Sequence, residues 1–167
     1  MDTPDTRAGV LTISDKGAQG LRADESGERI ASMLRDQGIT VAKQTIIPDD
    51  LEQIVHTLTT WVDHEGLPLI ITSGGTGLSP TDITPQAMRQ VIDYEVPGMA
   101  EAMRAASLKK TPHAMLSRAM TGVRKASLII NLPGSPRGAR ENLAVVLPAL
   151  PHGLSKLAGD PTECAIP

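Results

Sequence analysis

The stretch from Leu67 to Asp82 constrains the fold of this chain more than any other. It begins with a short apolar run, residues 67–71, whose β-branched members are typical of a strand buried on both faces of a parallel sheet. Gly74, Gly75 and Gly77 follow, and because glycine lacks Cβ the chain can turn sharply there and a ligand can approach the backbone closely. Backbone N–H groups in such a loop can converge on one oxyanion.

A helix is predicted directly after this loop. Thr84 suits the N-cap and Pro85 the first helical position. A strand, a glycine loop and a helix start in this order make an anion-binding site at the carboxyl edge of a sheet. A glycine-rich turn that binds nothing explains the same residues, so the loop alone leaves both interpretations open.

Two common phosphate-binding loops are excluded. The P-loop ends in Gly-Lys followed by Ser or Thr, and no lysine lies between Lys43 and Lys109. The dinucleotide fingerprint needs a third glycine two residues further on, but Gly75-Thr-Gly77 is followed by Leu78-Ser79-Pro80. An anion site at this loop therefore belongs to another class.

The length of 167 residues predicts one domain, and its core has to be aliphatic because the chain has no Phe, one Trp and one Tyr. So few aromatic side chains argue against base stacking, and we expect no nucleic-acid partner. The single cysteine, Cys164, excludes an internal disulfide and a cysteine-rich zinc site and fits a reducing compartment. Without a long apolar run or a signal peptide, we expect a soluble, cytoplasmic protein with no membrane partner.

Basic side chains gather between residues 102 and 140. That segment has no Asp or Glu and eight Lys or Arg: Arg104, Lys109, Lys110, Arg118, Arg124, Lys125, Arg137 and Arg140. A solvated positive face is one explanation, and a field that attracts a phosphorylated ligand is the other. The absence of carboxylates from the whole segment favours the second.

Alternating strands and helices predict an α/β fold, a three-layer αβα sandwich with a mostly parallel central sheet. Residues 1–7 are expected to form a flexible N-terminal arm, residues 8–157 one domain and residues 158–167 an extended tail. Strands are expected over 8–14, within 39–47, over 67–71 and over 126–132; helices over 25–37, from 49 to the residues before 66, over 85–94, 97–108 and 137–147, and towards 157; loops over 15–24 and 109–122; and helix caps at Asp24, Asp49, Thr84 and Ser135.

Ligands of a parallel sheet bind outside the carboxyl ends of its strands. At that edge the prediction brings together Ser14-Asp15, Pro48-Asp49 and the loops 74–82 and 131–136. Asp49 and Asp82 beside a phosphate need a neutralising partner. Mg²⁺ is the simplest one, because it takes one or two carboxylates, waters and phosphate oxygens.

Both carboxylates also have structural explanations. Asp49 with Glu52 three residues later is an ordinary capping box, which is a strong structural alternative. Asp82 has a weaker alternative, because Thr84 already suits the cap of the next helix. No nucleophile with a neighbouring His and Asp is visible in the sequence, so positioning and charge neutralisation are favoured over covalent catalysis.

Three motifs stand in order along the chain: Thr72–Asp82, Thr111–Arg118 and Asn131–Gly134. Together they closely resemble the MogA/MoaB family of molybdenum cofactor biosynthesis, to which the G domain of gephyrin belongs, over about residues 8–157. The resemblance implies a homotrimer of αβα subunits with MogA-type molybdopterin adenylyltransferase activity. Such an enzyme joins AMP from Mg·ATP to the terminal phosphate of molybdopterin, releases pyrophosphate, and passes its product to a downstream molybdenum-insertion protein.

The resemblance also implies roles for individual residues at matching positions. Asp49 and Asp82 would be the catalytic carboxylates and the Mg²⁺ ligands. Seven residues would lie on the nucleotide side: Gly74, Gly75, Thr76, Gly77, Asn131, Pro133 and Gly134. Three would contact molybdopterin: Ser107, Ser117 and Arg118.

A non-catalytic alternative is a MoaB-like carrier that binds molybdopterin at the same edge without turnover. MoaB-type patterns lack the Pro-Asp before the second helix and the Asn-Leu-Pro-Gly, whereas this chain has both, at Pro48-Asp49 and Asn131–Gly134. Two carboxylates help Mg²⁺-dependent transfer and add nothing to anion binding. The sequence therefore favours the enzyme.

Overall fold

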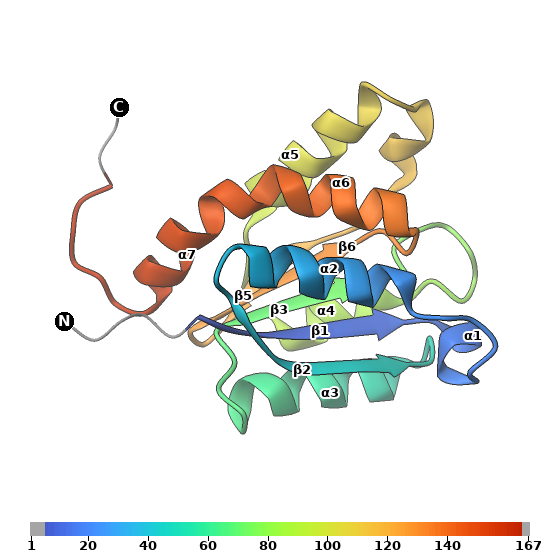
Figure 1. The fold of residues 1–167 in the computed structure, drawn as a ribbon, viewed down its shortest axis with the longest axis horizontal. Coiled ribbons are helices and arrows are strands. Elements are labelled where there is room, and N and C mark those ends of the chain that lie inside the picture. Colours follow the sequence, from blue (N-terminus) through green and yellow to red (C-terminus); the bar gives the residue numbers. More distant parts are fainter. Residues whose placement is uncertain (1–5, 165–167) are drawn as a thin grey trace.

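A six-stranded sheet forms the centre of the structure, a computed structural model that describes residues 6–164 (Figure 1). The strands are β1 (Arg7–Ile13), β2 (Thr40–Ile47), β3 (Leu69–Ser73), β4 (Tyr94–Glu95), β5 (Thr121–Arg124) and β6 (Ser127–Leu132). They lie in the order β2-β1-β3-β6-β5-β4. The first four are parallel, and β5 and β4 extend the sheet antiparallel. The predicted mostly parallel sheet is confirmed.

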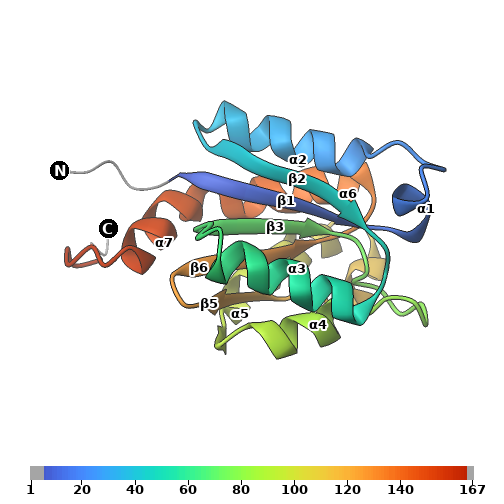
Figure 2. The same cartoon turned by 90° about the horizontal axis from the view of Figure 1, so that it is seen from below.

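Helices cover both faces of the sheet (Figure 2). They are α1 (Asp15–Ala18), α2 (Glu25–Asp36), α3 (Leu51–Asp63), α4 (Thr84–Val91), α5 (Pro97–Leu108), α6 (Pro136–Val146) and α7 (Leu150–Leu157), with 3₁₀ turns η1 (Pro112–Leu116) and η2 (Leu147–Ala149). The helices α2, α5, α6 and α7 pack on one face, and α3 and α4 pack on the other. This is the expected three-layer arrangement.

Each face of the sheet has its own apolar core. In β3, Leu69 and Ile71 belong to the core beneath α2 and α6, and Ile70 belongs to the core above α3 and α4. In β6, Ile130 and Ile129 divide in the same way. Strands covered on both faces need an apolar side chain at nearly every position, which is why their sequences read as continuous apolar runs.

Several predicted boundaries were wrong. The chain enters β1 at Arg7, which pairs with Thr40, so the arm cannot extend over all of residues 1–7; residues 1–5 lie outside the described part. The loop expected over 15–24 begins with the short helix α1. The helix expected over 85–94 ends at Val91, and β4 follows it. The expected tail, residues 158–167, follows the end of α7 at Leu157; within it the carboxylate of Asp160 accepts hydrogen bonds from Ser155 and Thr162, and residues 165–167 are not described.

The strand β5 was missed because its sequence, Thr-Gly-Val-Arg, contains one large apolar side chain and a glycine. It exists through pairing: its residues lie opposite β6 in an antiparallel hairpin. Lys125, with φ of 52°, makes the turn between the two strands. Local propensity does not report such a partner, which is a general weakness of strand prediction.

The helix caps correct two further predictions. Asp24 and Ser135 cap α2 and α6 as expected, by accepting from the N–H of Gly27 and Gly138. The cap of α3, however, is Asp50, whose side chain accepts from Gln53 N–H, and Asp49 is left outside the helix. Thr84 is the first residue of α4 and makes no cap.

The cations between residues 102 and 140 are held by structural contacts. Among residues 6–164, every one of the eight except Lys109 has a recorded hydrogen bond or ion pair. Arg124 and Lys125 pair with Asp63, whereas Arg118 donates to backbone carbonyls, which leave its charge unneutralised. The expectation that this segment attracts a phosphorylated ligand stays a prediction. Of the helices described, none is both long and apolar enough to cross a membrane.

Asp63 fastens the end of α3 to the β5–β6 hairpin. Its carboxylate accepts from Arg124 through Nε (3.1 Å) and Nη2 (2.6 Å) and lies 2.9 Å from Lys125 Nζ. Arg124 also donates to the carbonyl of Val91 at the end of α4. Hydrogen bonds from the two cations hold the pKa of Asp63 well below its usual range.

We expect Asp63→Asn to lower the melting temperature at neutral pH, and the gap to the wild type to narrow in acid. The folded-state pKa lies below the unfolded value of about 3.8, so the stabilisation is complete above that value and is lost as the pH falls below it. Thermal melts between about pH 7 and pH 2.5 measure the gap. Asp36→Asn, at an exposed carboxylate of α2, is the control. A gap independent of pH would contradict the assignment.

Candidate active site

Two cavities open at the carboxyl edge of the sheet. The first, which we call the sheet-edge cavity, measures about 560 Å³ and is lined from the loops that follow β1, β2, β3 and β6. Its polar lining includes Ser14, Asp49, Asp82 and Ser135. The four loops that the sequence placed at this edge thus meet in one cavity.

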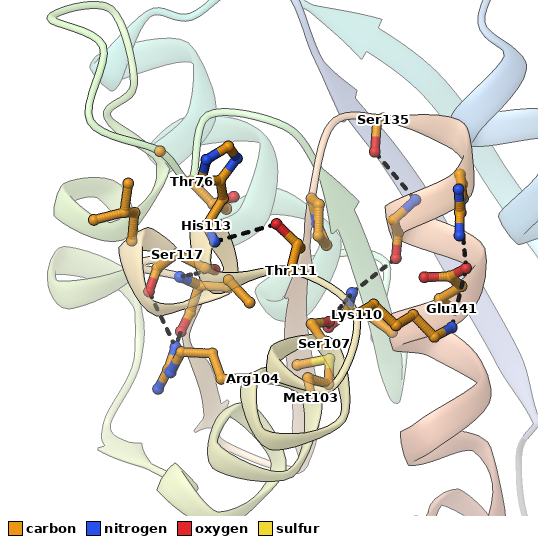
Figure 3. A pocket seen from close by; sticks show the side chains of 18 of the residues that line it. Thr76, Met103, Arg104, Ser107, Lys110, Thr111, His113, Ser117, Ser135 and Glu141 are labelled. Atoms are coloured by element: carbon orange, nitrogen blue, oxygen red, sulfur yellow. Dashed lines mark hydrogen bonds and ion pairs between the residues drawn. The ribbon is translucent and has the colours of Figure 1, made fainter.

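The second, which we call the helical cavity, measures about 510 Å³ and lies between α5, η1, α6 and the glycine loop (Figure 3). Ala100, Met103 and Pro133 supply apolar surface, and Ser107 and Ser117 supply hydroxyl groups. The two cavities share Ser135. They adjoin each other at the turn 133–135.

The glycine loop between them has a strained backbone that only glycine tolerates at low cost. Gly74 has φ of 108° and Gly75 has φ of 68°, both in the left-handed region. A Cβ on Gly74 would meet the carbonyl of Ile13, and one on Gly75 would meet Thr84 Oγ1 and lie 3.1 Å from Asp49 Oδ1. The loop therefore packs its backbone directly against β1 and against a candidate catalytic carboxylate.

Four consecutive carbonyls of this loop, at residues 74–77, accept hydrogen bonds from the protein. Thr84 donates to the carbonyl of Gly74 through Oγ1 (2.9 Å) and to that of Gly75 through its N–H (3.1 Å). Arg118 donates its N–H to the carbonyl of Thr76 (2.8 Å) and its Nε to that of Gly77 (2.8 Å). The predicted cap Thr84 thus serves as a clamp on the loop.

This clamp determines where the loop amides point. In a trans peptide the C=O and the following N–H point in opposite directions, so carbonyls turned into the protein turn the next amides outward. Within the described chain, the N–H groups of Gly75, Thr76 and Gly77 have no recorded acceptor, whereas that of Gly74 donates to Leu132. Three free amides at a cavity wall are suited to an anion.

Asp49 is held beside this loop by a reciprocal pair of hydrogen bonds. Its N–H donates to Asp15 Oδ1 (2.9 Å), and Asp15 N–H donates to Asp49 Oδ2 (3.3 Å). The pKa of Asp49 is raised, chiefly by burial and then by the negative charges of Asp15 and Asp82. A carboxylate that is half-buried and repelled by its neighbours is suited to a cation.

Asp82 approaches the same region from the far end of the loop. Its Oδ2 accepts from Ser79 N–H (3.0 Å), and its carbonyl accepts from Arg118 Nη2 (2.7 Å). Asp82 and Asp49 both line the sheet-edge cavity. In residues 6–164, no three Asp, Glu, His or Cys side chains gather as a ready-made metal site. Two carboxylates suffice for Mg²⁺, which takes its other ligands from water and substrate phosphate.

The structure distributes the twelve predicted site residues over different places. Asp49, Asp82, Gly74, Gly75 and Gly134 line the sheet-edge cavity. Thr76, Gly77, Pro133, Ser107 and Ser117 line the helical cavity. Three residues expected on the nucleotide side, Thr76, Gly77 and Pro133, therefore face the neighbouring cavity.

Two of the predicted residues line neither cavity. Asn131 is fully buried, and its carboxamide donates to Thr72 Oγ1 (3.0 Å) and accepts from Met120 N–H (3.2 Å). It joins β3 to the segment before β5. Arg118 points its guanidinium at the carbonyls of Gly77 and Asp82. Both residues shape the site from behind, in contrast to the contacts with substrate that the resemblance implies.

Sequence reasoning missed some residues at the two cavities. Asp15 was expected at the sheet edge and lines neither cavity; what the sequence missed is its pairing with Asp49, which spans two loops and has no local signal. Arg22 lines the sheet-edge cavity from a loop that the sequence left without a role. Glu141 lines the helical cavity; its signal was available, since it ends the segment without carboxylates and lies four residues after Arg137.

A family model described as a probable molybdopterin binding domain matches residues 9–152. The chain belongs to this family. Gephyrin of Dictyostelium discoideum is 42% identical over 165 residues, a match that covers 92% of this chain and 23% of gephyrin. The molybdopterin adenylyltransferase of Helicobacter pylori (strain J99) is 39% identical over 154 residues, which is 91% of this chain and 88% of that protein.

Solved structures agree with this membership. The molybdopterin biosynthesis enzyme MoaB of Thermus thermophilus has a TM-score of 0.88 and 51% identity, and the match covers 95% of this chain and 99% of that one. A structure of MogA has a TM-score of 0.86 and 40% identity, with 90% and 99% coverage. The resemblance to the MogA/MoaB family is confirmed, and both names within it occur among the similar structures.

We expect Arg118→Ala to weaken ligand binding in both cavities by similar factors. The substitution frees the carbonyls of Gly77 and Asp82 and relaxes the loop that separates the cavities. A loss of about 2 kcal/mol in stability is the scale for hydrogen bonds from a charged group. Calorimetric titration with Mg·ATP and with molybdopterin, and a thermal melt, measure the effects. Arg89→Ala, at an exposed arginine of α4, is the control. Loss of molybdopterin binding alone would instead indicate direct contact.

Proposed function

We propose that this protein is a molybdopterin adenylyltransferase of molybdenum cofactor biosynthesis, which transfers AMP from Mg·ATP to the terminal phosphate of molybdopterin and releases pyrophosphate. The observation that carries the proposal is the pair of cavities that adjoin at residues 133–135. The sheet-edge cavity has Asp49 and Asp82, and the helical cavity has apolar surface with hydroxyl groups and one carboxylate, Glu141. The similarity to the Helicobacter pylori adenylyltransferase supports the same activity.

The proposal places each substrate in one cavity. The nucleotide occupies the sheet-edge cavity, and the pterin ring lies on the apolar wall of the helical cavity, between Met103 and Pro133. The phosphate groups of both substrates then meet at the glycine loop, where three amides have no internal acceptor. This placement puts the terminal phosphate of molybdopterin next to the α-phosphate of ATP, as in-line transfer requires.

The reaction forms a bond from a phosphate oxygen of molybdopterin to the α-phosphorus of ATP and breaks the bond from that phosphorus to the bridging oxygen of pyrophosphate. The loop amides stabilise negative charge at the α-phosphate. Asp49 and Asp82 would hold Mg²⁺, which supplies positive charge to the phosphate oxygens. Asp15 keeps Asp49 in place, and Arg118 keeps the loop amides facing the substrates.

A MoaB-like carrier is the second candidate, and the similarity to the Thermus MoaB structure favours it. Binding two anions at this edge requires only the loop amides. Partial burial and the negative charge of Asp15 raise the pKa of Asp49, and a bound cation would offset both effects. A carrier gains nothing from that arrangement, so it supports the enzyme.

Pyrophosphate release on mixing the protein with Mg·ATP and molybdopterin tests the proposal directly. The enzyme releases one pyrophosphate for each adenylylated molybdopterin, and a carrier releases none. Omitting molybdopterin is the control for ATP hydrolysis. Binding of molybdopterin with no pyrophosphate release would replace the enzyme with the carrier.

We expect Asp82→Asn to remain folded, to bind molybdopterin and to lose turnover by a factor of about 10²–10³, the usual loss for one preorganised electrostatic element. An asparagine keeps an acceptor for Ser79 N–H, so the loop turn survives, but it removes the charge. Adenylylated product per minute at saturating Mg·ATP, with a thermal melt, is the measurement. Asp50→Asn is the matched control, because an asparagine still caps α3. Wild-type turnover in Asp82→Asn would remove Asp82 from the site.

Arg22 supplies a further prediction on the nucleotide side. It is the one Lys or Arg among the described residues that line the sheet-edge cavity, and no partner for it is recorded in residues 6–164. An arginine so placed can pair with the β- and γ-phosphates. We expect Arg22→Gln to weaken ATP binding about tenfold, the scale of one exposed charged contact, and to leave AMP binding unchanged. Calorimetry measures both, and Arg35→Gln is the control; equal losses for AMP and ATP would contradict this role.

The remaining expectations stay predictions. The resemblance implies a homotrimer and transfer of the product to a downstream molybdenum-insertion protein. The cysteine content suggests a cytoplasmic location. None of these is needed for the chemistry proposed above, because both cavities are formed by one chain.

A further inference from the structure

Glu141 is the one carboxylate among the described residues that line the helical cavity. The rest of the wall is apolar, hydroxyl-bearing, amide or cationic. Figure 3 shows Glu141 on α6, across the cavity from Thr111 and Ser117, with Lys110 reaching it from the end of α5. Its side chain is 20% exposed, so the carboxylate is neither hidden in the core nor free on the surface.

Three cations surround this carboxylate, and they share one of its oxygens. Lys110 Nζ lies 3.0 Å, Arg137 Nε 3.0 Å and Arg140 Nη2 3.8 Å from Oε1. Oε2 has no recorded partner in residues 6–164. Hydrogen bonds from Arg137 and Lys110 lower the pKa of Glu141, so the group stays ionised. A carboxylate needs only one oxygen for such a network, and the second remains an acceptor.

The helical cavity is where the proposed function places the pterin ring. The pyrimidine edge of a pterin presents two N–H donors side by side, from the 2-amino group and N3, followed by the 4-oxo acceptor. A carboxylate accepts two parallel N–H bonds, one at each oxygen, in the geometry it uses with arginine. Oε2 of Glu141 is free for the 2-amino group, and N3–H would share Oε1 with Lys110 and Arg137. A cation beside it can donate to the 4-oxo group, and Lys110 has this position relative to Glu141.

We propose that Glu141 is the specificity-determining residue of the helical cavity. Its carboxylate accepts hydrogen bonds from the 2-amino group and N3 of the pterin ring, while Lys110 donates to the 4-oxo group of the ring. This inference rests on the proposed function. Met103 and Pro133 then contact the ring faces, and Arg137 holds the carboxylate in position. A ring without the 2-amino donor loses one of the two bonds and leaves an acceptor facing the carboxylate.

A purely structural role is the alternative, because Glu141 also ties α6 to Lys110 at the end of α5. The two roles differ in what they discriminate. A structural role sets how well the cavity is formed and therefore affects every flat ligand alike. If Glu141 instead accepts hydrogen bonds from the ring, replacing it changes the preference between two rings of the same shape that differ in the donor at position 2.

The experiment compares pterin with lumazine, which has an oxo group in place of the 2-amino group. Quenching of the ligand's fluorescence gives both affinities without nucleotide. We expect the wild type to prefer pterin about tenfold or more, on the scale of a bidentate contact, and Glu141→Gln to reduce this ratio to about one. Glu101→Gln, at an exposed carboxylate of α5, should keep the wild-type ratio. A thermal melt checks that the variants are folded.

Lys110→Gln separates the two roles further, because it removes the ion pair between α6 and the end of α5 and leaves the carboxylate. Pterin and lumazine both carry the 4-oxo group, so we expect this variant to weaken both ligands and to keep the preference. A wild-type ratio near one, a preference that survives Glu141→Gln, or a preference lost equally in Lys110→Gln would overturn the inference. If the protein releases pyrophosphate but does not prefer pterin over lumazine, the role of Glu141 is refuted and the proposed activity stands. If it prefers pterin but releases no pyrophosphate, the proposed adenylyltransferase activity is refuted and the role of Glu141 stands.

Discussion

The site depends on the clamp that turns the glycine loop. Thr84 and Arg118, 34 positions apart in the sequence, hold the carbonyls of residues 74–77 and so direct the following amides outward. Neither side chain lines either of the two cavities. The proposed anion site therefore consists of backbone N–H groups, and the hydrogen bonds to the loop carbonyls fix its geometry.

The amino-acid composition does not show where the charged side chains lie relative to the two cavities. Most of the cations in the basic segment make structural contacts, whereas Asp49 has the negative charges of Asp15 and Asp82 nearby, which help to raise its pKa. Arg22 is the one Lys or Arg that lines the sheet-edge cavity among the described residues. A cation bound beside these carboxylates would offset their mutual repulsion. A carboxyl group with a raised pKa in a cavity is the pattern expected of a functional site.

The sequence predicted the three-layer class, the parallel strands and the edge of the sheet that carries the site, because buried strands and capped helices have local signatures. It missed β5, which depends on pairing with β6, and β4, which depends on pairing with β5, and it assigned the α3 cap to Asp49 where Asp50 makes it. Because Asp50 makes the cap, the side chain of Asp49 does not bind the helix and instead lines the sheet-edge cavity. The Asp15–Asp49 pair and the clamp by Arg118 join separate loops, and no local pattern reports them.

The turn 133–135 lies between the two cavities that the proposed function joins into one site. Ser73 Oγ donates to the carbonyl of Pro133 (2.9 Å), and Ser26 Oγ donates to that of Gly134 (2.7 Å), so the wall between the cavities is pinned from β3 and from α2. A Cβ on Gly134 would lie 3.3 Å from Gly74 Cα, so the two loops touch with no side chain between them. A wall this thin brings phosphates on either side into reach of each other. Transfer between two bound ligands requires that closeness, and storage of one ligand does not.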